Sequence, residues 1–488
     1  MLLGLHHTYA TLPSHFYAPV TPTPVANPQL VVFNTRLAQA LGLDVTAVER
    51  DAAAMFSGNQ LSEDANPIAM AYAGHQFGAF VPRLGDGRAI LIGELRGRDG
   101  VLRDVQLKGA GLTPFSRNGD GRAVLGPMLR EYLISEAMHA FGIPTTQSLA
   151  VVTTGERVYR ERVLPGAVLT RIAASHVRVG TFQYFAARDD QAALRELLEY
   201  VIARHYPVAK EADSPALAVL KEVAQRQAAL IANWMLVGFI HGVMNTDNMA
   251  ISGETIDYGP CAFMDEYDPK TVFSSIDHSG RYAYANQPTI AQWNLARFAE
   301  TLLPMIDPDL EKAVSRAVEV IESVTAQFDA LFLDGMRRKL GLTQPQEGDA
   351  ELIRRLLTHM QTSQADFTLT FRNLARMAND PTDEPKLREL FSADSDIETW
   401  LRDWRERLAH EPQTATERAT GMLAANPAFI PRNHRVEAAL NAAEEGDYGL
   451  FHKLLNIVQR PYDEQPAVAE FSQPPQSSER VLQTFCGT

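Results

Sequence analysis

Four short segments carry residue types that nucleotide chemistry uses. They are Leu84–Arg88 (LGDGR), Lys108 at the end of VQLK, His241–Asn248 (HGVMNTDN) and Ile256–Gly259 (IDYG). Glycines let a backbone approach phosphate oxygens, a lysine pairs with phosphate charge, and Asn and Asp oxygens are ligands suited to Mg²⁺. Each segment alone is common by chance, so the prediction depends on their order along the chain.

The first segment places Gly85, Gly87 and Arg88 just before a β-prone run at 89–96. A Gly-x-Gly turn that leads into a strand is one way to hold phosphates. The segment departs from the kinase G-x-G-x-x-G pattern, because Ile90 stands at the third glycine position. An ordinary turn is the alternative.

Lys108 ends the short run 105–108, and Glu131 follows in a segment with helical spacing. A strand lysine that faces phosphates is oriented in kinases by a helix glutamate. We therefore predict that Lys108 and Glu131 form an ion pair. The alternative is a solvated lysine at the end of a strand and an unrelated surface glutamate.

The third segment resembles the kinase catalytic loop H-R-D-x-x-x-x-N. Aligned letter by letter, His241 and Asn248 match, but Val243 stands where the kinase has its catalytic Asp. Valine cannot accept a proton. Asp247 is the carboxylate of this loop and is the candidate base, whereas His241, next to a helix-ending glycine, is expected to be structural.

The fourth segment, nine residues after Asn248, has the form Asp-aromatic-Gly, like the kinase D-F-G. Asn248 and Asp257 are thus candidate Mg²⁺ ligands, with nucleotide and water completing the coordination. Other metal and hydrolase patterns are absent from the sequence: H-E-x-x-H, G-x-S-x-G and the Walker A motif.

Other polar residues are ambiguous from the sequence. Asp120 and Gly121 form either a second loop on the phosphate side or a simple turn. Arg171 and Arg178 lie at and beyond a predicted strand, where arginines usually form surface ion pairs.

The elements that must position these residues change character along the chain. Short β-prone runs at 89–96, 105–108, 148–152 and 167–172 surround one helix over about 126–141. From about residue 190 the pattern is helical, with a helix that starts at Pro215 and runs to Ile240. The tail from about residue 463 is expected to be mobile.

This order predicts an α+β protein with a protein-kinase-like bilobal fold. We expect an N-terminal arm over 1–65, a β-rich N-lobe over 66–185, a helical C-lobe over 186–335, and a C-terminal helical extension and tail over 336–488.

Composition narrows the class further. The chain has 488 residues and a formal net charge of −14, which argues against sequence-independent binding to nucleic acid. Two cysteines, Cys261 and Cys486, exclude a disulfide framework and a four-cysteine zinc site. No run is long enough for a membrane span, and the N-terminus does not resemble a signal peptide. We expect a cytoplasmic protein without membrane contact.

Longer strings of sequence resemble the selenoprotein O family, protein adenylyltransferases with a kinase-like fold. The resemblance covers nearly the whole chain and is carried by AYAGHQFGAFVPRLGDGRA (71–89), QLKGAGLTPFSRNGDGRAVL (106–125), HGVMNTDNMAISGETIDYGPCAFMD (241–265), YAYANQPTIAQWNLARFAETL (282–302) and NPAFIPRNH (426–434).

The resemblance implies transfer of AMP from ATP to Ser, Thr or Tyr hydroxyls of proteins, with the nucleotide flipped relative to a kinase. It implies Asp247 as base and Asn248 and Asp257 as ligands of Mg²⁺, or of Mn²⁺ in its place. The implied nucleotide contacts are Gly85, Gly87, Arg88, Lys108, Asp120, Gly121, Arg171, Arg178 and Asp257, with Glu131 orienting Lys108. A flipped ATP gives the arginines a purpose, because its γ-phosphate points inward.

Two other functions use the same parts: a phosphotransferase with ATP in the usual orientation, and a non-catalytic ATP-binding scaffold, which Val243 favours. The end of the chain departs from eukaryotic members of the family, which end in Cys-x-x-selenocysteine, because here Cys486 is followed only by Gly and Thr. Cys486 either meets Cys261 across the fold or both remain thiols, as is usual in a reducing cytoplasm.

Overall fold

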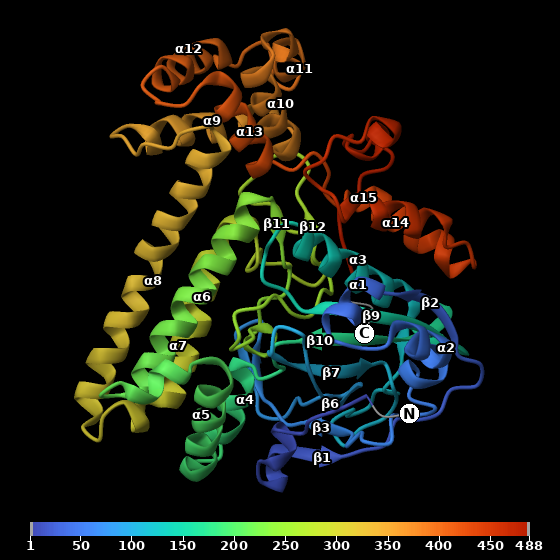
Figure 1. Ribbon diagram of the computed structural model, residues 1–488. Coiled ribbons are helices and arrows are strands. Elements are labelled where there is room, and N and C mark those ends of the chain that lie inside the picture. Colours follow the sequence, from blue (N-terminus) through green and yellow to red (C-terminus); the bar gives the residue numbers. More distant parts are fainter. Residues whose placement is uncertain (1–2, 486–488) are drawn as a thin grey trace.

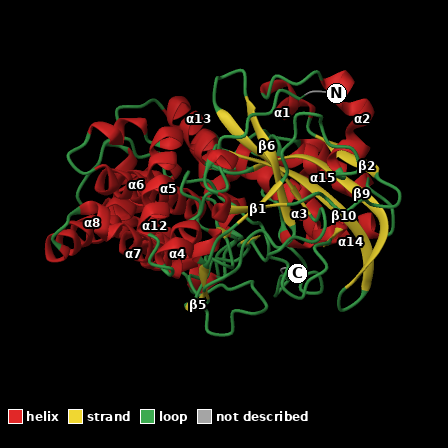
Figure 2. Cartoon of the chain, turned by 90° about the horizontal axis from the view of Figure 1, so that it is seen from below, coloured by secondary structure: helices red, strands yellow, loops and turns green. Residues whose placement is uncertain are grey.

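The computed structural model describes residues 3–485 and combines a twisted antiparallel sheet with a larger helical region (Figures 1 and 2). The sheet has eight strands. Seven follow the order β1 (Tyr17–Pro19), β3 (Ile68–Met70), β6 (Ala89–Arg96), β7 (Leu102–Lys108), β10 (Val163–Ala173), β9 (Gln147–Tyr159) and β2 (Gln29–Phe33), and β8 (Ala123–Val124) pairs with β10.

Helices cover both faces of this sheet. On one face, α1 (Thr35–Ala40) and α2 (Val45–Phe56) pack on apolar side chains such as Val105 and Leu107 of β7. On the other face lies α3 (Leu125–Ala140), the single helix expected near 126–141. Because side chains alternate along a strand, Gln106 and Lys108 of β7 point to the α3 side.

The N-terminal residues are part of this sheet region. β1 pairs with β3 at one edge of the sheet, and β2 pairs with β9 at the other. The segment expected as an arm over 1–65 therefore supplies the strands at both ends of the strand order and the helices on one face of the sheet.

The helical region begins with α4 (Val179–Ala186) and α5 (Gln191–His205), and then α6 (Pro215–Leu236), α7 (Gln287–Ile306) and α8 (Leu310–Lys339) pack together. The helix expected to run to Ile240 ends at Leu236. Gly238 has a φ of +74°, which breaks the helix, and Phe239–Ile240 (β11) instead pairs with Ala262–Phe263 (β12). This hairpin-like pair brackets the segment that contains Asn248 and Asp257.

The remaining helices extend this region and return to the sheet (Figure 1). They are α9 (Asp349–Ser363), α10 (Phe367–Asn379), α11 (Glu384–Arg388), α12 (Ile397–Leu408), α13 (Ala415–Ala425), α14 (Asn433–Glu444) and α15 (Gly449–Val458). α14 and α15 pack against α3, and Arg130 of α3 pairs with Glu437 of α14. Across the described residues, no helix is long and apolar enough to cross a membrane.

The tail, expected to be mobile from about residue 463, makes specific contacts with the rest of the protein. The Thr484 amide donates to the Phe273 carbonyl at 2.7 Å, and the Thr484 hydroxyl donates to the Pro260 carbonyl at 2.6 Å. Arg480 pairs with Glu266. The polar composition that suggested disorder instead supplies these hydrogen bonds and ion pairs.

Candidate active site

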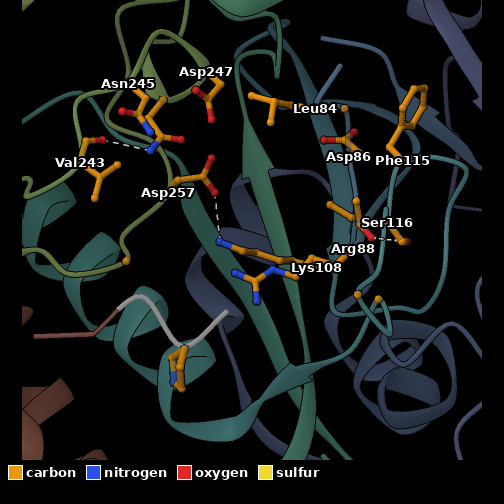
Figure 3. A pocket seen from close by; sticks show the side chains of 18 of the residues that line it. Leu84, Asp86, Arg88, Lys108, Phe115, Ser116, Val243, Asn245, Asp247 and Asp257 are labelled. Carbon is orange, nitrogen blue, oxygen red and sulfur yellow. Dashed lines mark hydrogen bonds and ion pairs between the residues drawn. The ribbon is translucent and has the colours of Figure 1, made fainter. Parts of the chain in front are cut away.

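A cavity of about 480 Å³ lies between the sheet and the helical region. Every residue predicted for the site lines it: Gly85, Gly87, Arg88, Lys108, Asp120, Gly121, Glu131, Arg171, Arg178, Asp247, Asn248 and Asp257. Figure 3 shows Lys108 reaching toward Asp257 across the pocket, with Asp247 near its upper rim and Asp86 and Phe115 on another wall.

The glycine loop before β6 is held closed by the following loop. Gly85 has a φ of +71°, and a Cβ there would lie 2.3 Å from the Phe115 ring, so only glycine is accommodated. The Thr113 hydroxyl donates to the Asp86 carbonyl at 2.7 Å, and the Ser116 hydroxyl donates to the Gly87 carbonyl at 2.5 Å. These contacts make the loop part of the pocket wall rather than an isolated turn.

The predicted ion pair between Lys108 and Glu131 is confirmed. The Lys108 ammonium lies 2.6 Å from a Glu131 oxygen, and both side chains are buried. The same ammonium is 3.0 Å from Asp257 Oδ1. The alternative of a solvated lysine and a surface glutamate is therefore excluded, and Lys108 joins α3 to the D-Y-G segment.

Asp257 is surrounded by cations. Its Oδ1 also accepts from Arg171 at 2.6 Å, and its Oδ2 accepts from Arg178 at 2.7 Å. Burial by itself raises the pKa of Asp257, but the charges of Arg171, Lys108 and Arg178 outweigh burial and hold that pKa well below its usual range. Asp257 therefore bridges all three cations, two of which, Lys108 and Arg171, also pair with Glu131.

The two arginines are buried, which overturns the expectation of surface ion pairs. Arg171 is 1% exposed and Arg178 is 3% exposed. Arg178 also donates to the Asp247 carbonyl at 2.7 Å, and its guanidinium lies over the Tyr72 ring, 4.7 Å from the centroid. Arg178 thus links the candidate base loop to the D-Y-G segment.

Asp247 lies in tightly packed surroundings. A Cβ on Gly74, the first residue of the hairpin β4 (Gly74–Gln76) and β5 (Ala79–Val81), would lie 2.5 Å from Asp247 Oδ1. Gln76 donates to Oδ2 at 3.4 Å, and Oδ1 has no hydrogen-bond partner within residues 3–485. Burial, partly offset by Arg178, raises the pKa of Asp247 to about 6.

Asn248 presents one amide oxygen for a ligand. Its side-chain NH₂ donates to the Val243 carbonyl at 3.0 Å, and this hydrogen bond fixes the direction of the Oδ1 atom of the same amide. The donor pair Asn248 and Asp257 has the hard oxygen chemistry that suits Mg²⁺. Among the described residues, there is no group of three or more His, Cys, Asp or Glu side chains that could hold a metal ion.

His241 behaves as predicted for a structural residue. Its ring is hydrogen-bonded to the Ile256 carbonyl at 2.9 Å and stacks on Trp234. Burial lowers the pKa of His241, so the ring is neutral near pH 7. It supports the backbone between the two acidic residues and does not line the cavity.

Asp120 and Gly121 form a wall of the same cavity. Both Asp120 oxygens accept from Arg160 at 2.9 Å, and this hydrogen-bonded ion pair lowers the pKa of Asp120. A Cβ on Gly121 would lie 2.2 Å from the Gly111 backbone. Asp120 is more exposed than Arg171 and Arg178, which together with Asp257 form the floor of the cavity. The loop of Asp120 and Gly121 therefore lies toward the outer part of the site.

Several residues of the cavity or next to it were not predicted, among them Tyr72, Asp86, Gln106 and Arg160. The sequence does contain a signal for Gln106. In Asp104-Val-Gln-Leu-Lys108 the polar residues alternate with apolar ones on a strand that is buried on both faces. Three polar side chains in a row on one buried face indicate a site.

The sequence left open whether Cys261 and Cys486 form a pair or remain thiols. Cys486 lies outside the described residues, which end at residue 485. Cys261 is buried and adjoins Pro260, whose carbonyl accepts from Thr484. The described part of the tail therefore ends close to the segment that holds Cys261.

Comparisons with known proteins identify the family of this chain. The family model described as Protein adenylyltransferase SelO matches residues 2–459. A protein named Protein nucleotidyltransferase YdiU from Rhizobium meliloti (strain 1021) is 61% identical over 483 residues, covering 99% of each chain. A protein of the same name from Rhodopseudomonas palustris (strain BisB5) is 58% identical and covers 99% of this chain and 98% of its own length. Another from Agrobacterium fabrum (strain C58 / ATCC 33970) is also 58% identical and covers 100% of both chains. Because these matches run along nearly its whole length, the chain belongs to the SelO family of protein adenylyltransferases.

Proposed function

We propose that this protein transfers AMP from ATP to Ser, Thr or Tyr hydroxyls of protein substrates. Membership of the SelO family supports the reaction class. We further propose that the sheet region and the helices from α4 onward correspond to the two lobes of a kinase-like fold, with the nucleotide between them. The position of the cavity between the two regions supports this arrangement.

The burial of Arg171 and Arg178 is the observation that carries the proposed orientation of ATP. Together with Lys108 they put three cations at the least exposed part of the cavity. Such a cluster suits the most highly charged end of a triphosphate, because charge-assisted hydrogen bonds are strongest away from water. The γ-phosphate then points inward, and the α-phosphorus lies nearer Asp247.

In the proposed reaction, Asp247 accepts the proton of the acceptor hydroxyl. The hydroxyl oxygen forms a bond to the α-phosphorus, the bond from the α-phosphorus to the bridging oxygen breaks, and pyrophosphate leaves. Lys108, Arg171 and Arg178 stabilise the negative charge of the leaving pyrophosphate. We propose that Asn248 and Asp257 hold Mg²⁺, or Mn²⁺ in its place, which supplies further positive charge next to the phosphates.

Isotopic labelling tests the proposal against both alternatives. With ATP labelled at the α-phosphate, we expect label in a protein acceptor and release of pyrophosphate, and with label at the γ-phosphate we expect none. A phosphotransferase gives the opposite labelling, and a non-catalytic scaffold gives neither. Transfer of γ-label by the wild-type protein would overturn the proposal.

Arg178→Glu sharpens this test. The substitution places a carboxylate beside Asp257 in a buried site and removes a phosphate partner, so ATP affinity should fall by about tenfold or more. Arg83→Glu, at an exposed position near the glycine loop, is the matched control for an added negative charge. Equal ATP affinities for the two variants would show that Arg178 does not contact the phosphates.

A further inference from the structure

Strand β7 carries a row of buried polar side chains that the proposed reaction only partly uses. Asp104, Gln106 and Lys108 are 2%, 0% and 7% exposed and share one face of the strand. Buried polar groups are costly unless they are hydrogen-bonded. Lys108 is explained by Glu131 and Asp257, but Gln106, at the centre of the sheet, has no assigned role.

Gln106 lies directly opposite Arg171 in the pairing of β7 with β10. Its Oε1 atom accepts from Arg171 Nη2 at 2.6 Å, and its NH₂ donates to Asp86 Oδ2 at 3.2 Å. A guanidinium only donates and a carboxylate only accepts, so these two neighbours allow a single orientation of the amide.

Asp86 is in turn fixed by the backbone. Its Oδ2 atom accepts from the Met70 amide at 3.1 Å, and the residue is 2% exposed on the wall of the cavity. Hydrogen bonds therefore run without a break from the Met70 amide through Asp86 and Gln106 to Arg171.

The far end of this chain of hydrogen bonds is functional. Arg171 Nη1 is shared between Asp257 at 2.6 Å and Glu131 at 3.2 Å, while Gln106 holds Nη2. Arg171 Nε has no hydrogen-bond partner within residues 3–485. Gln106 is thus the neutral group that fixes the rotation of the guanidinium once phosphates compete for Nη1.

We propose that Asp86 is a positioning residue for the nucleotide, which acts through Gln106 to fix the guanidinium of Arg171. This role rests on the proposed function only in so far as Arg171 contacts the triphosphate. Without Asp86 the amide of Gln106 is free to turn its NH₂ toward the guanidinium, and two donors then face each other. Asp86 itself makes no contact with the nucleotide in this proposal.

The chain offers a matched pair of substitutions at this position. Asp86→Asn keeps one oxygen, and the Met70 amide directs that oxygen to the position of Oδ2, where it still accepts from Gln106. Asp86→Leu has similar size and removes the acceptor. Gln106→Met breaks the same chain of hydrogen bonds one residue later, with little change in volume.

Kinetics and ATP binding by the full-length protein test the proposal. Asp86→Leu and Gln106→Met should each raise KM and Kd for ATP about tenfold, because the interaction is made in both bound ground state and transition state. kcat should change less than about threefold on the same reasoning. Asp86→Asn should stay within about twofold of the wild type because it keeps the hydrogen bonds.

A double-mutant cycle separates positioning from a general structural role. Arg171→Lys removes Nη2, so adding Asp86→Leu to it should raise KM by less than about twofold further. An equal penalty in both backgrounds would overturn the proposal, as would a wild-type KM for Asp86→Leu. If Asp86→Leu does not fold, as judged by thermal unfolding, the cycle is run with Gln106→Met and has the same two outcomes.

Failure of the proposed function would appear differently. If the wild-type protein transfers no α-label, the reaction is wrong, but the Kd values for ATP still test whether Asp86 acts through Arg171. If α-label is transferred normally and the Asp86→Leu and Gln106→Met variants bind ATP like the wild type, the reaction stands and the positioning role falls.

Discussion

Two acidic residues of the cavity, Asp257 and Asp247, occupy opposite electrostatic environments. Asp257, on the floor, contacts Lys108, Arg171 and Arg178, and those charges depress its pKa. Asp247, in the loop above, receives one long hydrogen bond from Gln76, and burial raises its pKa to about 6. The difference fits the separate tasks that we propose for them: Asp257 holds fixed charges, and Asp247 accepts a proton.

The largest effect should follow from removing the carboxylate of the floor. Asp257→Asn keeps the shape but leaves Arg178 without its carboxylate, leaves Lys108 and Arg171 with Glu131 alone of the two carboxylates they contact, and removes the anionic ligand of the proposed Mg²⁺ site. We expect AMP transfer to fall by more than about 10³-fold. The free energy of unfolding of the nucleotide-free protein should fall by about 3–5 kcal/mol.

Transfer rates at saturating ATP and Mg²⁺, together with denaturant unfolding, measure both effects. Asp120→Asn is the comparison variant, because its carboxylate lines the same cavity but is more exposed and forms its ion pair with Arg160. A transfer rate for Asp257→Asn within tenfold of the wild type would contradict the assignment of Asp257.

Asp247→Asn tests the other side of the comparison. Loss of a general base lowers the rate by about 10²–10⁴-fold. ATP affinity should change little, because the Asn side chain leaves the backbone carbonyl that Arg178 binds in place. Since the base must be ionised, the wild-type rate should rise with pH up to about 6 and then level off.

The measurements are single-turnover rates across pH and ATP binding by calorimetry. A modest loss of rate with an unchanged pH profile would mean that Asp247 positions the acceptor instead of taking its proton.

The smallest effect concerns the stability of the protein and its dependence on Asp86, a further carboxylate of the cavity wall. Burial raises the pKa of Asp86 to about 6. Arg178, the Met70 amide and Arg171 oppose this rise, and Asp257 adds to it. A raised pKa means that the stability contributed by this group is complete below its ordinary pKa and is lost as pH rises through about 6. Asp86→Asn cannot ionise, so it should be more stable than the wild type by about 1–3 kcal/mol at pH 8.

This advantage should disappear toward pH 4, where Asp86 is protonated in the wild type. Denaturant unfolding at several pH values measures it. Asp120→Asn is the control with the opposite sign, because the pKa of Asp120 is lowered and its removal should cost stability at pH 8. An advantage for Asp86→Asn that is equal at pH 4 and pH 8 would show that ionisation of Asp86 is not its source.

The sequence predicts the parts of the site whose chemistry is local. Gly85 and Gly87 next to a strand and Asp257 in D-Y-G follow from residue type and short spacing. The pairing of Lys108 with Glu131 follows from the kinase-like order of a strand lysine and a helix glutamate, and the structure brings all five residues into one cavity. The resemblance to a known family added Arg171 and Arg178, whose types and positions alone favoured the surface.

What could not be predicted depends on strand pairing and burial. Gln106 meets Arg171 because β7 pairs with β10 in one register, and no local pattern specifies that register. The end of α6 at Leu236 was missed because Phe239 and Ile240 gain a partner strand more than 20 residues later, which competes with the helical apolar pattern. The polar tail was expected to be mobile because its hydrogen-bond partners, such as the Pro260 carbonyl, are distant in sequence.

The contact between Thr484 and the segment at 273–275 has a consequence for how the protein is made. All residues that line the cavity lie between positions 72 and 276, whereas Thr484 is synthesised some 200 residues later. Chains fold from the N-terminal side as they emerge from the ribosome. The nascent protein therefore passes through a stage in which the cavity residues are present but the hydrogen bonds between Thr484 and the segment at 273–275 have not yet formed.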